Sequence, residues 1–309
     1  YHSDREHFTQ IAKETGLSRT QVEYKFNRFI KEKIIKKFMT IFNYGALGYS
    51  TYAILLIKLG KFSSFNQFTK KLERNKNCIS WGECFGKYDI FMNLIFRNEE
   101  EISKFLSDII NEKNEPISDY LIIKPHMAEF HSLKMFYDNK KPLFPITFPN
   151  EKEKKIDEKD IKILKILEKD NRTKLIDIAK ETNLSAELVL YKIKKLKENG
   201  IILGSKAFLD MKKLGYNYSI ILLNIRNLSE KIKKEIINFA RNEKMVNALL
   251  LSLFNPNCVM QIFHKTDDEL KDEIRKIKDF FKEETIDLEI LLATDEDKIN
   301  TLPLGIQIY

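Results

Sequence analysis

The feature that most constrains this sequence is an internal duplication. Residues 11–18 read IAKETGLS and residues 178–185 read IAKETNLS, so seven of eight positions are identical at an offset of 167 residues. The same offset aligns residues 47–49 with residues 214–216 without a gap, and both triplets read LGY. A register that holds over most of each half predicts two homologous halves that fold into the same kind of unit.

Each half begins with a helical pattern, which is most complete in the second half. Apolar residues recur at helical spacing over residues 156–167, and a short second helix is expected at 173–181. Asn183 tolerates the left-handed backbone of a tight turn, and Ser185 can cap the third helix that follows. Alternating residues over 201–209 then predict a short two-stranded wing.

The rest of each half follows the order strand, helix, strand, strand, helix, strand. In the first half we expect strands at 50–59, 78–85, 88–96 and 117–123, and helices at 65–74 and 99–111. The second half repeats this order between residues 218 and 293. This order is that of the split βαβ pattern. We therefore predict an α+β chain in which two winged helix-turn-helix domains alternate with two ferredoxin-like (βαββαβ) domains.

Domain boundaries follow from these elements. We place winged helix-turn-helix domains at 1–45 and 156–210, ferredoxin-like domains at 46–125 and 211–309, and a linker at 126–155. The linker is expected because three prolines and a charge run lie near its end, which is typical of a semi-stiff connection. Tyr1 aligns with Glu168, inside the opening helix of the second half. We therefore expect the first domain to be truncated at its N-terminus.

Composition is compatible with a nucleic-acid partner without requiring one. The chain has 53 Lys and Arg against 45 Asp and Glu, a formal net charge of +8, and 43% hydrophobic residues that can form substantial cores. Its apolar runs are far shorter than the roughly 18 residues of a membrane span. Cys78, Cys84 and Cys258 lack zinc-site spacing, so we expect three core thiols in a reducing cytoplasm.

The motif residues of the second half form a specific set. They are Asp157, Asp160, Ile163, Leu164, Ile178, Ala179, Leu184, Ser185, Val189, Leu196, Gly200, Ile201, Ile202, Leu214, Gly215 and Tyr216. With the predicted domain order, this set resembles the Lrp/AsnC family of leucine-responsive, or feast/famine, transcriptional regulators. The resemblance covers nearly all of both halves and omits only the linker and the tail after Ala293. It implies a protein that binds double-stranded DNA. Independently, the abundance of Lys, Ile and Asn is typical of an AT-rich genome and indicates an archaeal or bacterial source.

The resemblance also implies how the halves associate. In the family, two ferredoxin-like sheets stack face to face to form the dimer, so residues 46–125 would serve as an effector and dimerisation domain. Here the two partners are covalently joined, so one chain would form a pseudo-dimer with two DNA-reading heads. Association of two such chains would give a homo-oligomer, a dimer of pseudo-dimers.

The resemblance assigns a DNA-reading helix to each half. The residues expected to contact DNA are Ser18, Arg19, Thr20, Glu23, Tyr24 and Arg28 in the first half, and Ser185, Ala186, Glu187, Leu190, Tyr191, Lys194 and Lys195 in the second. The outward sets differ while the buried faces agree. Two readers of different half-sites would show this pattern, and so would drift after one copy lost DNA binding. Both segments are locally basic, although lysine-rich helix faces are usually only solvated surface.

An effector site is implied in the first half alone. Gly86, Tyr88 and Asp89 match the family's Gly-x-Tyr-Asp turn, whereas the equivalent second-half residues read Leu-Phe-Asn-Pro. If an amino-acid effector site is kept, the first half holds it and the second half is effector-blind.

Two other functions fit the same architecture. Siroheme and heme d1 pathway decarboxylases resemble this family, but they use a His in the hairpin that corresponds to residues 81–94, where this chain has none. His126 and His131 are more typical of surface residues than of a site. We predict no enzyme activity, no catalytic residue, no cofactor and no metal ligand. A sequence-tolerant chromatin protein would show strong salt dependence with little discrimination between sites.

Overall fold

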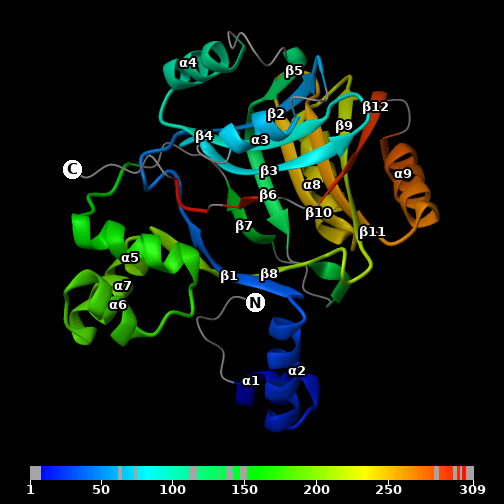
Figure 1. Ribbon diagram of the computed structural model, residues 1–309. Coiled ribbons are helices and arrows are strands. Elements are labelled where there is room, and N and C mark those ends of the chain that lie inside the picture. The colour runs from blue at the N-terminus through cyan, green and yellow to red at the C-terminus, as the bar shows by residue number, and fades with distance from the viewer. Residues whose placement is uncertain are drawn as a thin grey trace. The chain divides into compact units, whose positions relative to one another are not determined.

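In a computed structural model of the chain, the described residues are 8–61, 65–72, 75–110, 117–131, 133–136, 142–146, 152–281, 285–294, 298–299 and 301–303 (Figure 1). The chain divides into two compact units, and each unit draws on both halves of the sequence. The head unit comprises residues 1–48, 152–214 and 300–309, and the sheet unit comprises residues 49–151 and 215–299.

The head unit contains both helix-turn-helix segments. Its elements are α1 (Phe8–Thr15), α2 (Arg19–Lys31) and β1 (Ile35–Phe42) from the first half, and α5 (Glu158–Lys169), α6 (Leu175–Thr182), α7 (Ala186–Glu198) and β8 (Ile202–Leu209) from the second. The three helices predicted in the second half are confirmed. They enclose a small core in which Leu164, Ile178 and Val189 are fully buried.

Local capping explains where these helices begin and end. Asp157 caps α5, and its carboxylate accepts a hydrogen bond from the backbone N–H of Asp160. The Asp160 carboxylate in turn accepts from the backbone N–H of Asp157, which completes a capping box. Ser185 caps α7 by accepting from the N–H of Leu188. Between α6 and α7 the chain turns at Asn183, which has a φ of 53°. Gly16, its equivalent in the first half, has a φ of 70°.

The wing differs from the predicted strand pairing. Residues 202–209 form one continuous strand instead of a hairpin, and β8 pairs antiparallel with β1 of the other half. Gly204 stays within the strand and lies opposite Ile41. The alternating pattern was correct for strand but could not identify the partner strand, because β1 lies far away in the sequence.

The sheet unit contains two ferredoxin-like arrangements. Its first-half elements are β2 (Thr51–Leu59), α3 (Phe65–Leu72), β3 (Cys78–Phe85), β4 (Ile90–Phe96), α4 (Glu99–Ile110) and β5 (Ile117–Ile123). Its second-half elements are β9 (Asn217–Ile225), α8 (Glu230–Asn242), β10 (Val246–Ser252), β11 (Cys258–His264), α9 (Asp267–Phe281) and β12 (Thr285–Ala293). The strand orders β5-β2-β4-β3 and β12-β9-β11-β10 are equivalent, which confirms the predicted α+β class.

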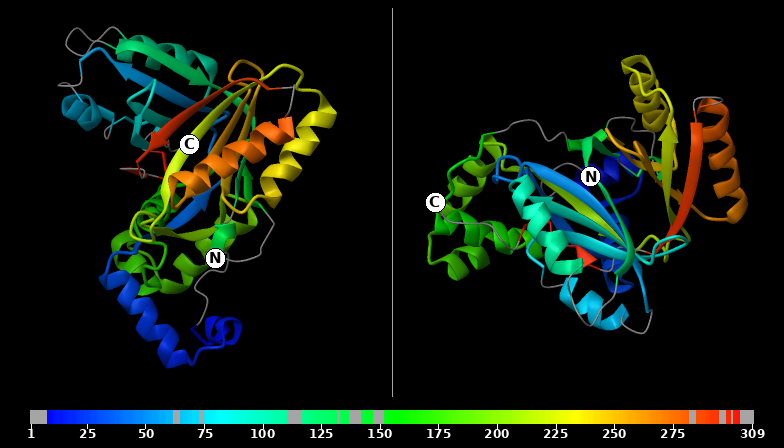
Figure 2. Two further views of the ribbon diagram at one scale, coloured as in Figure 1. Left: turned by 90° about the vertical axis from the view of Figure 1, so that its right-hand side faces the viewer. Right: turned by 90° about the horizontal axis from the view of Figure 1, so that it is seen from above.

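Both faces of each sheet are buried. Helices cover one face, where Leu55 packs in the first-half core and Leu223 in the second-half core. Figure 2 shows these helices on the outer sides of the strands. Alternate residues such as Leu56 and Phe91 point to the helix-free face and are also buried. There the Phe91 ring of β4 lies 6.1 Å from the ring of Tyr218 on β9, so the two sheets contact each other through their helix-free faces.

Strands beyond each ferredoxin-like fold extend onto the other half. After β5, β6 (Pro125–His131) pairs with β10, and β7 (Pro142–Ile146) pairs with β6. The end of β12 pairs with β3, as does β13 (Lys298–Ile299). Pro125 lies opposite Ser252, and Leu292 lies opposite Phe85, so the two pairings are equivalent under the 167-residue offset. Each half therefore contributes a C-terminal strand to the sheet of the other.

The predicted linker at 126–155 is therefore wrong for residues 126–131 and 142–146. One of the three prolines that suggested the linker, Pro142, is the first residue of β7. Proline is tolerated at the first position of a strand, so its presence did not exclude a sheet. Residues 137–141 and 147–151 of the predicted linker lie outside the described part of the chain.

The cysteines are buried, as expected of core residues. Cys78, Cys84 and Cys258 carry free thiols, and burial raises the pKa of Cys84 to about 12. Such a thiol is protonated and inert at neutral pH. None of the described helices has the length and apolar composition that crossing a bilayer requires.

Candidate nucleic-acid interface

The first recognition helix presents all of its predicted DNA-contacting side chains to solvent. Ser18, Arg19, Thr20, Glu23, Tyr24 and Arg28 are exposed. Tyr24 is 68% exposed, whereas Val22 on the opposite side of α2 is buried. The predicted inward and outward faces of α2 are therefore correct. Whether the exposed face contacts DNA stays a prediction.

The second recognition helix has the same arrangement. Ser185, Glu187, Leu190, Tyr191, Lys194 and Lys195 are exposed, and Ala186 is partly exposed. Val189 and Leu196 are buried on the inner face. Leu190 and Tyr191 are 55% and 59% exposed, which is unusual for two large side chains next to each other on a small head.

An ion-pair cluster fixes the second recognition helix against α5. The Lys192 ammonium lies 2.6 Å from Asp157 Oδ2 and 3.0 Å from Asp160 Oδ1. Burial alone would lower the pKa of Lys192, but its hydrogen bonds to both carboxylates raise that pKa above its usual value. Lys192 thus positions the helix and stays charged, while Lys194 and Lys195 face solvent.

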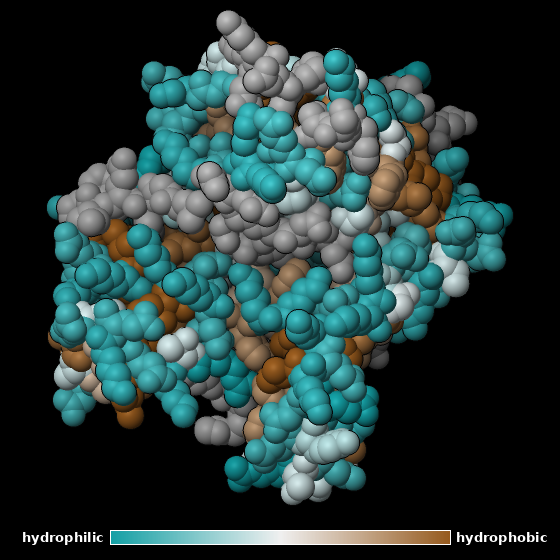
Figure 3. All heavy atoms as spheres, viewed as in Figure 1, coloured by the Kyte–Doolittle hydropathy of each residue, from teal (hydrophilic) through white to brown (hydrophobic). Residues whose placement is uncertain are grey.

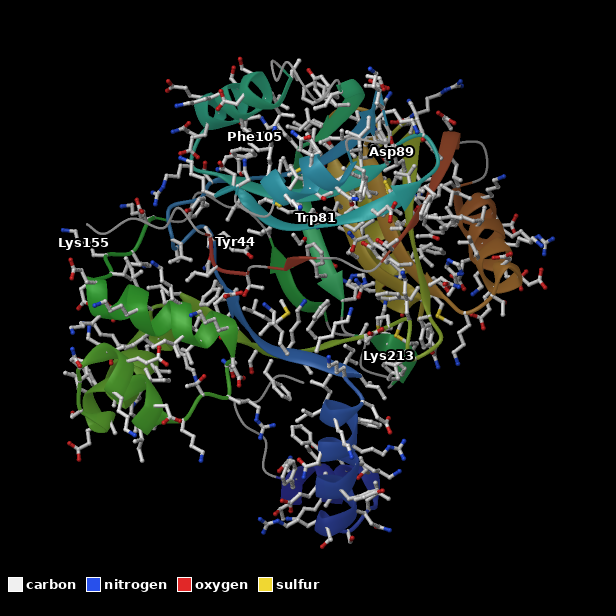
Figure 4. The ribbon with its side chains drawn as sticks, in the orientation of Figure 1. Tyr44, Trp81, Asp89, Phe105, Lys155 and Lys213 are labelled. Carbon is white, nitrogen blue, oxygen red and sulfur yellow. The ribbon has the colours of Figure 1, made fainter. Side chains whose placement is uncertain are left out.

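The first recognition helix is held partly by residues of the second half. The Arg172 guanidinium lies 4.8 Å above the ring of Phe26 on α2 and 5.0 Å above the ring of Phe38 on β1. At the C-terminal end of α2, the Lys213 ammonium donates a 2.7 Å hydrogen bond to the carbonyl of Glu32 (Figure 4 labels Lys213). The two heads therefore depend on each other for their local structure.

The β1–β8 ribbon joins the two heads about a local twofold relation. Met39 lies opposite Lys206, and these residues are 167 positions apart, so they are equivalent in the two halves. Ile35 lies opposite Leu209, which is the equivalent of Phe42. An antiparallel pair in which equivalent residues meet is the geometry of an isologous contact.

The recognition helices also carry exposed residues that were not predicted. Asn27 is exposed on α2 at the position equivalent to Lys194, so the offset could have identified it. Gln21 completes a capping box with Ser18, and the Ser-x-x-Gln pattern predicts this contact. Leu188 is 40% exposed beside the outward face of α7.

Some exposed cations in this interface already have acidic neighbours. Arg28 lies 3.3 Å from Glu32, and Lys194 lies 3.7 Å from Glu198, each one helical turn away. Solvent-exposed pairs of this kind stabilise a helix by about 0.3 to 0.5 kcal/mol. This energy is small, so a phosphate could replace either carboxylate.

The predicted effector residues form a tight turn. The Asp89 carboxylate accepts from the Lys58 ammonium and from the backbone N–H of Leu59, both at 2.8 Å (Asp89 is labelled in Figure 4). Tyr88 is buried. Gly86 has a φ of 135°, which residues with a side chain rarely adopt, and a Cβ there would make a tight 3.2 Å contact with a methyl carbon of Leu291, so a larger residue would strain this turn. The structure brings the three residues together and engages Asp89 internally.

A cavity lies beside the equivalent hairpin of the second half. It has a volume of about 260 Å³ and is lined by Ile122, Ile123, Lys124, Ser252, Phe254 and Asn255. This is the hairpin in which the sequence pattern predicts no effector site. Its lining is largely apolar, and Lys124 Nζ is paired with the Glu99 carboxylate of α4.

One charged cluster is buried where β6 meets the second half. The Glu129 carboxylate accepts hydrogen bonds from Arg241 Nε at 2.9 Å and from the other guanidinium arm. His131 lies 3.4 Å from the same carboxylate, and its other ring nitrogen lies 3.2 Å from the carbonyl of Val246. The expectation that His131 lies on the surface is therefore wrong, because β6 is covered on this side, whereas His126 is exposed.

Lys134 completes this cluster. Its ammonium donates a 2.5 Å hydrogen bond to the carbonyl of Ala240 and lies 3.2 Å from His131 Nδ1. Burial lowers the pKa of Lys134 to about 8, although three carboxylates act in the opposite direction. The cluster ties the exchanged strand to α8 and β10.

Comparisons with known proteins agree with the geometry of the second head. Residues 156–202 match the family described as winged helix-turn-helix DNA-binding. The chain is 30% identical over 118 residues to the HTH-type transcriptional regulator FL11 of Pyrococcus furiosus, covering 38% of this chain and 78% of that protein. It is 34% identical over 119 residues to the HTH-type transcriptional regulator LrpA of Pyrococcus horikoshii, covering 38% of this chain and 83% of that protein.

Among solved structures, those of the siroheme decarboxylase NirDL resemble both halves together. The crystal structure of the siroheme decarboxylase NirDL aligns with 97% of this chain and 87% of its own, with a TM-score of 0.62 and 15% sequence identity. At this identity the likeness concerns the fold alone.

Proposed function

Because the chain belongs to the Lrp/AsnC family of transcriptional regulators, we propose that it acts as a pseudo-dimer whose two heads bind one DNA duplex. The observation that carries this proposal is the β1–β8 ribbon, in which Met39 meets its equivalent Lys206. In two family subunits joined by such a contact, the recognition helices would be related by the same local twofold relation. The single chain keeps both heads together at any concentration.

Charge and exposure support DNA as the partner. The segment 19–37 carries seven Lys or Arg against two Glu, and the segment 189–206 carries five Lys against one Glu. The outward faces of α2 and α7 are solvated and basic, which suits contact with phosphates. Arg19 at the start of α2 is placed to reach a base edge, and Lys194 is placed to reach the backbone.

Footprinting the chain on DNA upstream of its own gene tests this proposal. We expect protection at low salt that weakens steeply as salt rises. Arg19→Ala and Lys194→Ala should each weaken binding by about 1 to 3 kcal/mol, and the phosphate-contacting variant should also show a shallower salt slope. Lys231→Ala is the control, because Lys231 is an exposed lysine on α8 of the sheet unit. Absence of protection at low salt would contradict the proposal.

We further propose that the first-half turn of Gly86, Tyr88 and Asp89 is the site of an amino-acid effector. A free amino acid is a zwitterion, and Asp89 with Lys58 offers one charge of each sign within 2.8 Å. Binding would exchange this internal ion pair for pairs with the ligand. The second half has Ile225 and Pro256 at these two positions and offers neither charge.

The effector proposal is tested by Asp89→Asn. Asparagine keeps an oxygen that can accept from the N–H of Leu59, so the fold should be preserved. We expect the variant to bind DNA like the native chain but to lose any change in affinity caused by a mixture of the twenty amino acids, measured by fluorescence anisotropy. Asp108→Asn, at an exposed carboxylate on α4, should keep the response. An unaltered response in Asp89→Asn would contradict the proposal that this turn binds the effector.

A decarboxylase remains the second candidate because the NirDL fold spans nearly the whole chain. Against it, residues 81–94 contain no histidine, whereas an acid or base is needed there by analogy with those enzymes. Tetrapyrrole absorbance in the purified protein would favour this candidate over the regulator.

A further inference from the structure

The two recognition helices differ most at positions that face solvent. Under the 167-residue offset, Arg19 corresponds to Ala186 and Glu23 corresponds to Leu190, whereas Tyr24 corresponds to another tyrosine, Tyr191. The buried side is kept, since Val22 corresponds to Val189 and both are buried. The buried scaffold of the two heads is therefore nearly symmetric, whereas their exposed side chains differ in chemical character.

The first helix presents hydrogen-bonding groups. Arg19 and Glu23 are both exposed, and they lie one turn apart on α2. In the major groove, an arginine pairs with the O6 and N7 acceptors of guanine, and a glutamate accepts from the N4 amino group of cytosine. This pair of side chains therefore suits a half-site that contains a G·C base pair.

The second helix presents apolar groups at the same two positions. Ala186 is partly exposed, and Leu190 is more than half exposed one turn further along α7. Neither can form a side-chain hydrogen bond to a base. The apolar group that bases offer in the major groove is the thymine C5-methyl. Contact with this methyl removes apolar surface of both partners from water.

The surroundings of Leu190 distinguish it from a scattered surface leucine. Single exposed apolar residues are common and need no partner. Here Lys194 and Lys195 follow one turn later on the same outward side, opposite the buried Val189. Two lysines beside an apolar side chain suit a groove lined by phosphates, while the exposed Glu187 lies about one turn before Leu190. Figure 3 shows hydrophobic residues among the hydrophilic ones over α5 to α7.

We propose that this chain reads an asymmetric operator, in which the second head recognises thymine methyl groups through Leu190 and Ala186 and the first head recognises a G·C pair through Arg19 and Glu23. The proposal rests on the proposed function as a DNA-binding regulator. It names the bases that each head selects. A homodimer would place the same side chains over both half-sites, and the fused chain does not.

The test begins with selection of duplexes from a random library by the full chain. We expect two unlike half-sites, one rich in A·T pairs. Replacing each contacted thymine by uracil removes only the methyl group and should weaken binding about fourfold, which corresponds to one buried methyl. The same replacement in the other half-site is the control and should leave affinity unchanged.

Two variants assign the half-sites to the heads. In Leu190→Ala, uracil in the A·T-rich half-site should change affinity by less than about twofold, because the contacting side chain is gone. In Glu23→Ala, selection for cytosine in the other half-site should relax while the uracil effect stays. Both residues are exposed, so neither change should alter the unfolding temperature.

The possible failures are separable. Identical half-sites, or unchanged affinity after uracil substitution, would overturn the asymmetric readout while DNA binding itself stands. If no duplex is selected at low salt, both the proposed DNA-binding function and the asymmetric readout are contradicted.

Discussion

Replacing Glu129 by alanine is expected to destabilise the protein by about 3 to 5 kcal/mol, because it removes the buried carboxylate that offsets the charge of the buried Lys134 ammonium and pairs with the partly exposed Arg241 guanidinium. Glu129 is 4% exposed and accepts both hydrogen bonds of the Arg241 side chain. His131 and Lys134 lie in the same buried cluster. The loss should be measured by guanidinium unfolding, followed through the fluorescence of Trp81, the single tryptophan, which is buried on β3.

A surface pair provides the control for this prediction. Glu99 pairs with Lys124, but its side chain is largely exposed. Glu99→Ala should therefore cost less than about 1 kcal/mol. Equal losses in the two variants would mean that the Glu129 cluster is not buried in solution.

The same cluster predicts how stability depends on pH. Burial alone would raise the pKa of Glu129, but hydrogen bonds from His131 and Arg241 lower it from 4.5 to about 2. A carboxyl whose pKa is lower in the folded state contributes its full stabilisation above the unfolded value. That contribution should decline as the pH falls from about 4.5 towards about 2. Glu129→Gln should lack this part of the acid dependence.

Phe91→Ala is expected to cost about 3 to 5 kcal/mol as well, for a different reason. Phe91 is fully buried on the helix-free face of the first sheet and contacts Tyr218 of the second. Truncation leaves a cavity between two sheets whose paired strands resist collapse into it. Unfolding followed by Trp81 fluorescence measures the loss.

Phe85→Ala is the matched control, since Phe85 is an exposed phenylalanine on the neighbouring strand β3. It should change stability by less than about 0.5 kcal/mol. A small effect at Phe91 would show that the helix-free faces do not pack on each other.

Much of the fold could be predicted because its signals are local. The spacing of apolar residues over 156–167 predicted α5, and the Asn183-Leu184-Ser185 sequence predicted the turn between α6 and α7. The ferredoxin-like order followed from the succession of strand-like and helical segments, and the predicted bounds of 78–85 and 258–264 agree with β3 and β11. The internal duplication strengthened the prediction of the fold, because the same pattern occurs separately in each half.

The pairing between halves could not be predicted in this way. Alternation indicates that residues 202–209 form a strand, but it does not indicate that β1 is the partner. The same holds for β6, most of which lies in the segment that was interpreted as a linker. Its burial depends on β10, more than 100 residues away, and so does the buried position of His131.

The candidate interface could be predicted from helix geometry. All of the chosen residues of α2 and α7 are at least partly exposed, because the inward positions follow the 3.6-residue period. The effector turn was harder to interpret. The sequence suggests that Asp89 is available to a ligand, whereas Lys58 and the N–H of Leu59 already engage its carboxylate. Those contacts depend on the pairing of β2 with β4.

The position of Met39 opposite Lys206 predicts how the two halves would pair if they were produced as separate chains. In a homodimer of the second half alone, the residue at the ribbon axis would meet its own copy, and two lysine ammonium groups would stand across from each other. Like charges directly opposite on neighbouring strands are destabilising. The first half, with a methionine there, carries no such repulsion. The second half should therefore form a less stable ribbon with its own copy than with its fused neighbour.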